Sequence, residues 1–308
     1  MGIVLSIIVP VFNEEGSLPE LCERLVRAAE TTGRGYEILL VNDGSRDRTY
    51  DIMKELREKH GTVRVVDFDG RFGQHAALLA GIIMSRGELV CPIDADLQND
   101  PGDVIPMLEK LEEGYDVVKG VRVKRMAPWL RKRYSFIANK VLRLLVNHEV
   151  RDYGCHFGVY RKSLFRGLID KGRMPKHILL YAFRRGVKMA EIPVKDLKRR
   201  DTSRYKFLSL LKIFMEVVMT FLIYSKKGYA FFEFWLVMSY VNLALVLVMS
   251  LAAVFDRLSA SVASAALFVL LALGLGQLLA HLMVRKHILE YDMEFGGKPP
   301  YRIREILG

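Results

Sequence analysis

The stretch Ser6-Ile7-Ile8-Val9-Pro10-Val11-Phe12-Asn13-Glu14-Glu15 is an apolar run that ends in a polar, acidic turn. A short apolar run bounded by turn residues is typical of a buried β-strand whose carboxyl end opens onto a loop. Further strand-like runs are separated by helix-like segments, and the whole set is Ile3–Val11, Glu37–Val41, Val63–Phe68, Glu88–Ile93 and Asp116–Lys119. Strands that alternate with helices predict an α/β fold of the doubly wound type.

Two helix starts support this pattern. Ser17-Leu18-Pro19-Glu20 has the spacing of a capping box with proline in the first turn, and it predicts a helix through about Glu30. Gly44–Asp47 closes a strand and predicts a second helix over Thr49–Lys59. Ligands of such sheets bind beyond the carboxyl ends of the strands, so the polar loops there are expected to meet in one crevice.

Two carboxylates in one of these loops predict a cation. Asp94 and Asp96 follow the strand-like residues Val90–Ile93, and the alternation along a strand points both side chains the same way. Neighbouring carboxylates repel one another unless a cation lies between them, and hard oxygen ligands suit Mg²⁺ or Mn²⁺. Taken alone, the pair is equally compatible with an Asp-rich turn that caps a helix.

Charge is distributed unevenly along the chain. Residues 1–116 hold 12 Lys and Arg against 22 Asp and Glu, whereas residues 117–228 hold 28 against 7. This basic segment runs directly into an apolar stretch, which favours an anionic membrane surface and phosphate ligands over nucleic acid. The three cysteines lie far apart in the sequence, which argues against a disulfide framework or a thiolate zinc site.

Two long runs without charged side chains, Phe234–Phe255 and Leu258–Val284, predict a transmembrane hairpin. Each is long enough to cross a hydrocarbon core of about 30 Å. Lys226–Lys227 before the hairpin and Arg285–Lys286 after it place its outer ends in the cytoplasm. We therefore expect a multi-pass protein of the cytoplasmic (inner) membrane, with the catalytic domain and both termini in the cytoplasm. The alternative is a buried helical pair in a soluble protein.

The predicted organisation has four parts, which are a catalytic domain (1–200), juxtamembrane amphipathic helices (201–228), the hairpin (229–284) and a cytoplasmic tail (285–308). After Tyr205, apolar residues recur at helical spacing with lysines between them, which fits a helix in the membrane interface or one packed on the domain. The oligomeric state is open, although Gly274 and Gly276 would permit close helix contact in a homo-oligomer.

Three motifs carry a resemblance to a known family, namely SIIVPVFNEE at 6–15, VNDGSRDRT at 41–49 and DADLQ at 94–98. They resemble the inverting glycosyltransferases of family 2, which have the GT-A (Rossmann-like) fold. Further motifs are similar to the polyprenyl-phosphate glycosyltransferases, which include transferases of 4-deoxy-4-formamido-L-arabinose to undecaprenyl phosphate and dolichyl-phosphate mannose synthases. These motifs are Phe72–His75, Glu113–Val118, Trp129–Lys132, Asp152–Cys155 and Glu191–Val194. The resemblance covers residues 1 to about 225.

The resemblance implies inverting transfer of a sugar from a nucleotide-sugar to the phosphate of a polyprenyl phosphate. The expected donor is UDP-linked and carries a 4-amino-4-deoxy-L-arabinose derivative or a hexose. The residues implied in nucleotide binding are Pro10, Phe12, Glu14, Val41 and Asp43. Those implied in holding the metal, Mg²⁺ or Mn²⁺, and the diphosphate are Asp94, Asp96 and Gln98. Phosphates of donor or acceptor are expected at Arg122, Arg131 and Ser135, and catalysis is assigned to Asp96, Arg122 and Arg131.

One run departs from the family pattern. The family has Arg-x-x-Gly-x-Ser-Lys-Tyr before its interfacial helices, whereas here Asp201 stands in place of the glycine. The arginine has become Lys198 or has shifted to Arg199. The phosphate contacts implied for this run are therefore shared among Lys198, Arg199 and Arg204.

The acceptor phosphate explains why the sequence offers no obligatory general base. A phosphate monoester is already largely ionised at pH 7, because its second pKa is about 6. His75 and His156 remain as alternative acid/base residues. A processive polysaccharide synthase with the same chemistry should carry Gln-x-x-Arg-Trp, which is absent around both tryptophans. A membrane scaffold would leave Asp96 unexplained, and a transporter would need more than two helices around its substrate.

Overall fold

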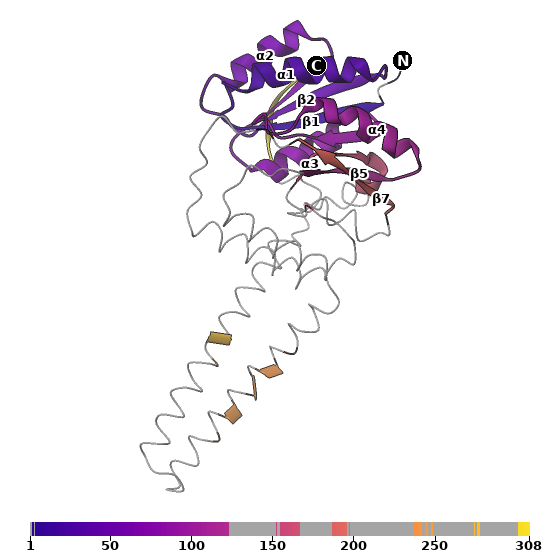
Figure 1. Cartoon of the computed structure of the whole chain (residues 1–308). Helices are drawn as coiled ribbons and strands as arrows, with labels where there is room; N and C mark the ends of the chain where they lie inside the picture. Colours follow the sequence, from indigo (N-terminus) through magenta and orange to yellow (C-terminus); the bar gives the residue numbers. More distant parts are fainter. Residues whose placement is uncertain are drawn as a thin grey trace. The chain divides into compact units, whose positions relative to one another are not determined.

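The computed structural model describes residue 2 and residues 4–122, 152, 155–166, 187–195, 197 and 301–308, with isolated positions between 234 and 277 (Figure 1). The chain divides into two compact units. One unit comprises Met1–Arg204 together with Met293–Gly308, and the other comprises Tyr205–Asp292. Most of the predicted tail therefore belongs to the same unit as the predicted catalytic domain.

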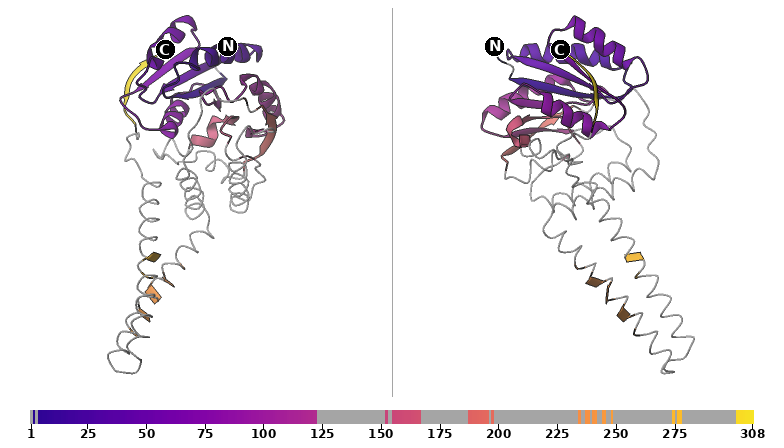
Figure 2. Two further views of the ribbon diagram at one scale, coloured as in Figure 1. Left: turned by 60° about the vertical axis from the view of Figure 1, so that its left-hand side comes forward. Right: turned by 180° about the vertical axis from the view of Figure 1, so that it is seen from behind.

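The first unit is built on a mixed sheet. Its strands are β1 (Leu5–Val11), β2 (Tyr36–Asn42), β3 (Val63–Phe68), β4 (Leu89–Pro92), β5 (Val117–Arg122), β6 (Gly158–Arg161), β7 (Met189–Val194) and β8 (Ile303–Leu307). The described strands lie in the order β7-β5-β6-β4-β1-β2-β3-β8, and Figure 2 shows β8, in yellow, at one side of the sheet. Strands β1 to β4 are parallel, as the alternating pattern predicts. β6 and β8, which the sequence did not predict, pair antiparallel with β4 and β3 respectively.

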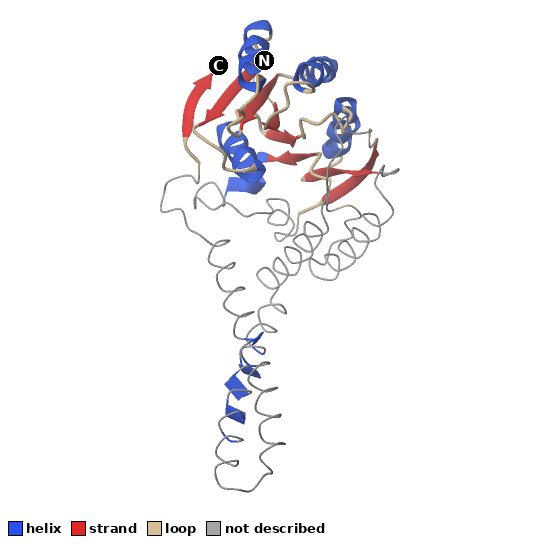
Figure 3. Ribbon diagram, turned by 90° about the vertical axis from the view of Figure 1, so that its left-hand side faces the viewer, coloured by secondary structure: helices blue, strands red, loops and turns tan. Residues whose placement is uncertain are grey.

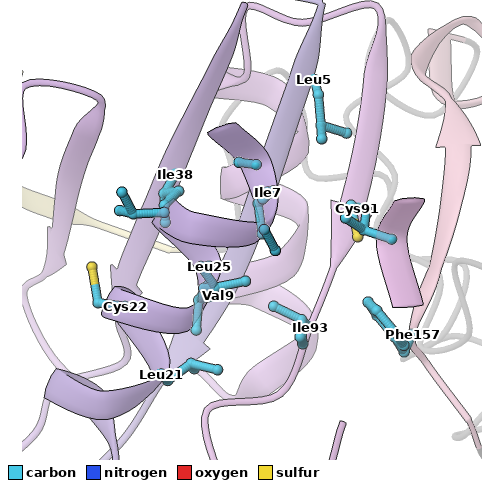
Figure 4. Packing of buried hydrophobic residues seen from close by; sticks show 14 of the residues in the cluster. Leu5, Ile7, Val9, Leu21, Cys22, Leu25, Ile38, Cys91, Ile93 and Phe157 are labelled. Atoms are coloured by element: carbon cyan, nitrogen blue, oxygen red, sulfur yellow. The ribbon is translucent and has the colours of Figure 1, made fainter. Parts of the chain in front are cut away.

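Helices cover both faces of this sheet (Figure 3). They are α1 (Leu18–Thr31), α2 (Thr49–Lys59), α3 (Gln74–Met84) and α4 (Val104–Glu112). Residues of α1, α2 and α4 join one hydrophobic cluster and residues of α3 join the other. In the first cluster, Leu21 and Leu25 of α1 lie near Val9 of β1 (Figure 4). The doubly wound architecture is therefore confirmed.

On the other face, α3 approaches β1 closely at a glycine. A Cβ atom added to Gly81 would lie 2.2 Å from Cγ2 of Ile8, which is closer than any real contact. The absence of a side chain at Gly81 lets α3 lie directly on β1. The amino end of α3 is thereby held beside the loops that follow the parallel strands.

The capping box predicted at Ser17 is wrong in its hydrogen bonding, although the helix begins where expected. Ser17 occupies the N-cap position but makes no side-chain capping bond. Its hydroxyl instead donates to Oε2 of Glu14 at 2.6 Å. The neighbouring carboxylate in the β1–α1 turn is a stronger acceptor for the hydroxyl, so the side chain points away from the helix amides.

A buried ion pair lies at the amino end of the sheet. Glu37 is 1% exposed and accepts hydrogen bonds from Oγ of Ser6 at 2.6 Å and from Nη1 of Arg64 at 2.8 Å. The backbone N–H of Arg86 also donates to this carboxylate. Burial alone would raise the pKa of Glu37, but these hydrogen bonds outweigh it and lower the pKa below its ordinary value. The carboxylate thus joins β1, β2 and β3 at the end of the sheet opposite to the polar loops.

The predicted juxtamembrane helices and hairpin lie almost wholly outside the described residues. Within the part of the chain that is described, no helix is long and apolar enough to cross a membrane. The described positions of the first predicted span are helical, and many of their apolar side chains are exposed, namely Phe234, Val237, Met238, Tyr240, Val241, Leu245 and Val248. The hairpin stays a prediction.

Candidate active site

The topology brings the loops after β1 to β4 and the end of β5 to one edge of the sheet. Strands β1 to β4 are parallel, so the loops that follow them leave the sheet on the same side. β4 and β5 both pair antiparallel with β6 and therefore run in the same direction. The end of β5, at Arg122, thus lies at the same edge as Asp94 and Asp96. The expected crevice of polar loops has a structural basis in this strand order.

The β1 and β2 loops are tied together by hydrogen bonds. The backbone N–H of Asn13 donates to Oγ of Ser45 at 3.0 Å, and Oδ1 of Asn13 accepts from the backbone N–H of Arg46 at 2.9 Å. The backbone N–H of Glu14 donates to Oγ1 of Thr49 at 2.9 Å. Asn13 has a positive φ of 53°, a conformation in which asparagine is enriched. Together these hydrogen bonds hold the backbones of the β1 and β2 loops in one arrangement.

Asp43 holds the loop between β3 and α3. It is 3% exposed, and its Oδ1 accepts from the backbone N–H of Phe72 at 2.6 Å and of Gly73 at 2.8 Å. Gly73 has a φ of 95°, which favours glycine. In this structure the carboxylate of Asp43 is engaged with protein amides. Its predicted contact with a nucleotide stays a prediction.

The Asp43→Ala variant should lose about 2–3 kcal/mol of unfolding free energy, because two loop amides lose a charged acceptor. Urea or thermal unfolding of the purified chain measures this loss. The matched control is Asp69→Ala in the same loop, whose exposed carboxylate forms long ion pairs within the described part of the chain, at 4.0 Å with Arg302 and 3.9 Å with Arg304. The control should change stability by no more than about 0.5 kcal/mol. Equal effects of the two substitutions would contradict the role given to Asp43.

The remaining residues predicted to bind the nucleotide differ in their accessibility. Phe12 is partly buried, and the guanidinium of Arg71 lies 4.0 Å from the centre of its ring. Pro10 and Glu14 are also partly buried. Val41 is 0% exposed and packs in the cluster beneath α3. Phe12, with Arg71 above it, is therefore more accessible than Val41. The contact expected from Val41 stays a prediction.

The acidic loop after β4 alternates between the core and the surface. Ile93, Ala95 and Leu97 are buried, whereas the polar side chains between and after them, Asp94, Asp96 and Gln98, are partly exposed. Oδ1 of Asp96 accepts from the backbone N–H of Gln98 at 3.1 Å, and Oδ1 of Asp94 accepts from Nε2 of Gln74 at 2.6 Å. The alternation predicted for the two carboxylates is thus present, and each is oriented by a hydrogen bond.

The donor set of this loop fits a hard divalent cation. Among the residues that the structure describes, no three His, Cys, Asp or Glu side chains group as metal ligands. Asp94 and Asp96 instead offer two carboxylates with partial access to solvent. Mg²⁺ is commonly held by one or two carboxylates, with substrate phosphates and water completing its octahedron. The protein ligands fit such a cation best when the substrate supplies the remaining oxygens.

Arg122 is paired with an acidic residue of the chain. Its Nε and Nη2 donate to the two carboxylate oxygens of Asp152 at 2.7 Å and 2.9 Å. Both side chains are largely buried, with 12% and 9% exposed. The ammonium of the buried Lys119 donates to the backbone carbonyl of Asp152, and burial lowers the pKa of Lys119. Asp152 therefore fixes the orientation of the guanidinium predicted to meet phosphate.

The two histidines considered as acid/base residues lie close together. The ring centres of His75 and His156 are 6.3 Å apart, in an edge-on arrangement. Burial, with the nearby charges of Lys119 and Arg122, lowers the pKa of His156 to about 4. His156 is therefore neutral at pH 7 and cannot donate a proton as an imidazolium.

Several predicted residues lie outside the described part of the chain, namely Arg131, Ser135, Lys198, Arg199 and Arg204. The structure also places in the site residues for which no role was predicted. Gln74 binds Asp94, Arg71 covers Phe12 and Asp152 pairs with Arg122. Gln74 and Asp152 lie within motifs quoted for the family resemblance, so a signal for them was present, although not one that named their partners.

Comparison with known proteins gives a family match over about half of the chain. The model of glycosyl transferase family 2 matches residues 6–169. Among curated relatives, the undecaprenyl-phosphate 4-deoxy-4-formamido-L-arabinose transferase of Edwardsiella ictaluri is 35% identical over 216 residues, which is 70% of this chain and 66% of the relative. The enzyme of that name from Pseudomonas aeruginosa is 36% identical over 217 residues, covering 70% and 64%. The match therefore spans slightly less than two thirds of the length of these relatives.

Solved structures share the fold. Glucosyl-3-phosphoglycerate synthase from Mycobacterium tuberculosis, in complex with Mn²⁺, UDP and glucosyl-3-phosphoglycerate, superposes with a TM-score of 0.55 at 20% identity. The alignment covers 72% of this chain and 79% of that chain. The complex of the same enzyme with Mn²⁺ and UDP-glucose gives a TM-score of 0.53 at 17% identity. At this identity the likeness extends to the GT-A fold alone.

Proposed function

Because the chain belongs to glycosyltransferase family 2, we propose that it transfers a sugar, with inversion, from a nucleotide-sugar to the phosphate of a polyprenyl phosphate. The observation that carries this proposal is the position of Asp94 and Asp96 at the same edge of the sheet as the loops after β1, β2 and β3 and the end of β5 at Arg122. The names of the curated relatives support undecaprenyl phosphate as the acceptor.

The donor lies across the ends of β1 to β4. The loops of Asn13 and Asp43 fix the backbone around the nucleotide, and Phe12 with Arg71 borders the pocket. Asp94, Asp96 and Gln98 would hold Mg²⁺ or Mn²⁺ and the diphosphate. Such an ion, when bound, offsets the negative charge that builds on the departing nucleoside diphosphate. The hydrogen bond from Gln74 keeps the carboxylate of Asp94 in one orientation.

The acceptor approaches from the side of β5. Its phosphate is already an oxyanion at neutral pH and attacks the anomeric carbon without a base. Arg122, oriented by Asp152, places a guanidinium fork near the phosphates, and guanidinium binds phosphate oxygens in a bidentate manner. Arg131, Ser135, Lys198, Arg199 and Arg204 complete the phosphate contacts in this proposal.

The acceptor lipid requires the enzyme to work at a bilayer. In this proposal, residues 1–200 form a cytoplasmic GT-A domain, residues 201–228 amphipathic helices at the interface and residues 229–284 a transmembrane hairpin. Lysines and arginines at both outer ends of the hairpin place the tail, 285–308, on the same cytoplasmic side. The exposed apolar side chains at the described positions from 234 to 248 support a lipid-facing helix.

A glycolipid assay with the purified full-length chain tests the proposal. The chain is incubated with Mn²⁺ and a panel of UDP-sugars, including a 4-amino-4-deoxy-L-arabinose derivative, with GDP-mannose as a further donor. We expect a glycolipid from undecaprenyl phosphate and none from undecaprenol, which lacks the phosphate nucleophile. Absence of product with every donor, or equal product from undecaprenol, would contradict the proposal.

A further inference from the structure

Strand β8 returns to the first unit after residues 205–292 and is the outermost strand on one side of its sheet, next to β3 (Figure 2). It pairs antiparallel with β3 in a register that joins Val65 to Leu307 and Phe68 to Ile303. The pairing extends past the strand, because the backbone N–H of Asp69 donates to the carbonyl of Arg302 at 2.9 Å. Since the two strands are antiparallel, β8 begins at the edge of the sheet where the polar loops lie.

An aromatic contact joins the start of β8 to the β3–α3 loop. Tyr301 is 5% exposed, and its ring stacks on Phe68 with centres 4.9 Å apart and planes 13° apart. Phe68 in turn meets the ring of Phe72 edge-on at 5.7 Å. Stacked and edge-on pairs of this kind fix the relative orientation of their rings. Phe72 is thus held from the side of β8 as well as by its own backbone.

The segment that contains Phe72 makes contacts with both acidic parts of the site. Its backbone amides at Phe72 and Gly73 donate to Asp43, and the next residue, Gln74, donates to Asp94 at 2.6 Å. Residue Arg71 lies over the ring of Phe12. A displacement of Phe72 would therefore move the groups that orient Asp43, Asp94 and Phe12 together.

A second contact runs from β8 to the β2–α2 loop. Nη1 of Arg304 lies 3.2 Å from Oδ2 of the buried Asp67, whose Oδ1 accepts from Nδ2 of Asn42 at 2.7 Å. Oδ1 of Asn42 accepts from the backbone N–H of Ser45 at 3.1 Å. Ser45 is the residue whose hydroxyl binds Asn13. β8 thus supports the loops that follow β1 and β2 through polar contacts, and the loop after β3 through aromatic contacts.

We propose that β8 sets the donor-binding loops, with Tyr301 as the positioning residue that acts through Phe68 and Phe72. The inference rests on the proposed function for the identity of the donor. Loss of the Tyr301 ring should allow the 69–74 loop to fluctuate. Part of the binding energy of the nucleotide-sugar is then used to order this loop. The Michaelis constant for the donor then rises, whereas kcat at saturating donor stays nearly constant.

The test uses the full chain in detergent micelles and two readouts. Hydrogen–deuterium exchange follows the amides of Phe72 and Gly73, and steady-state assays measure KM and kcat for the donor. In Tyr301→Ala we expect faster exchange at both amides and a donor KM about three- to tenfold higher, the range of one lost aromatic pair. Tyr301→Phe keeps the ring and should restore both values. Ile306→Ala, in β8 itself at a side chain 47% exposed, is the matched control and should change neither.

The outcomes separate the inference from the function on which it rests. Unchanged exchange at Phe72 and Gly73 in Tyr301→Ala would overturn the positioning role, whatever the assay gives. A fall in kcat without a rise in donor KM would also overturn it, because a loosened loop should affect binding first. If the parent chain makes no glycolipid and binds no UDP, the proposed function fails, and the exchange readout still decides whether β8 holds the loop.

Discussion

The Asp96→Asn variant should transfer sugar at least about a hundredfold more slowly than the parent chain. A metal that stabilises a departing group contributes several kcal/mol to the transition state, and each 1.36 kcal/mol is about tenfold in rate. Asparagine keeps the shape of the side chain and an oxygen that can accept from the amide of Gln98, as Oδ1 of Asp96 does at 3.1 Å. The loop should therefore stay folded while one anionic ligand is lost.

The glycolipid assay described above, at saturating Mn²⁺ and donor, measures this effect. Asp51→Asn makes the same chemical change on the surface of α2, where Asp51 pairs with the nearby exposed Lys54 at 2.8 Å. This control should retain full activity. Full activity in Asp96→Asn, with an unchanged melting temperature, would remove Asp96 from the catalytic machinery and with it the metal role given to the loop.

The Glu37→Ala variant should lose ~3–5 kcal/mol of unfolding free energy, the usual cost of removing one partner from a buried ion pair. The substitution leaves Arg64, which is 9% exposed, without its carboxylate, and it removes the acceptor for Oγ of Ser6 and the amide of Arg86. Thermal or urea unfolding measures the loss. Glu58→Ala, at an exposed position of α2, should be nearly neutral.

A double variant and a pH series sharpen this prediction. Adding Arg64→Met to Glu37→Ala removes the orphaned charge and should recover part of the stability, and failure to recover any would argue against the ion pair as the cause. Because the folded protein lowers the pKa of Glu37 below 4.5, its stabilising contribution is complete above that pH. The contribution is lost as the pH falls below 4.5 and through the lowered pKa. The gap between parent and variant should therefore narrow on acidification.

The sequence predicted the parallel half of the fold well. The strand Val63–Phe68 has the predicted bounds, and the helix Thr49–Lys59 does as well. Both elements are strongly patterned, and β3 pairs with β2, the strand that precedes it in the chain. β6, β7 and β8 were missed because they are short and pair with strands far away in sequence. Local patterns carry no information on such partners.

The same distinction holds for the site. Parallel strand order was enough to predict that Asp94 lies at the same edge of the sheet as the loops after β1 and β2. The partners of individual side chains could not be predicted from the sequence, because Gln74 reaches Asp94 and Asp152 reaches Arg122 only once the loops are folded. The capping box failed for a related reason, because Glu14 competes for the hydroxyl of Ser17 from outside the motif.

The position of β8 in the chain also bears on the order of events at the ribosome. Residues 301–308 emerge only after the whole of 205–292 has been synthesised, whereas α1 to α4 and β1 to β5 emerge first. Until then β3 lacks its outer neighbour and presents unpaired backbone groups along one side, an arrangement that invites pairing with other chains. During synthesis this unit thus passes through a stage in which the other strands are present, β3 has an unpaired edge and the contacts from β8 are still missing.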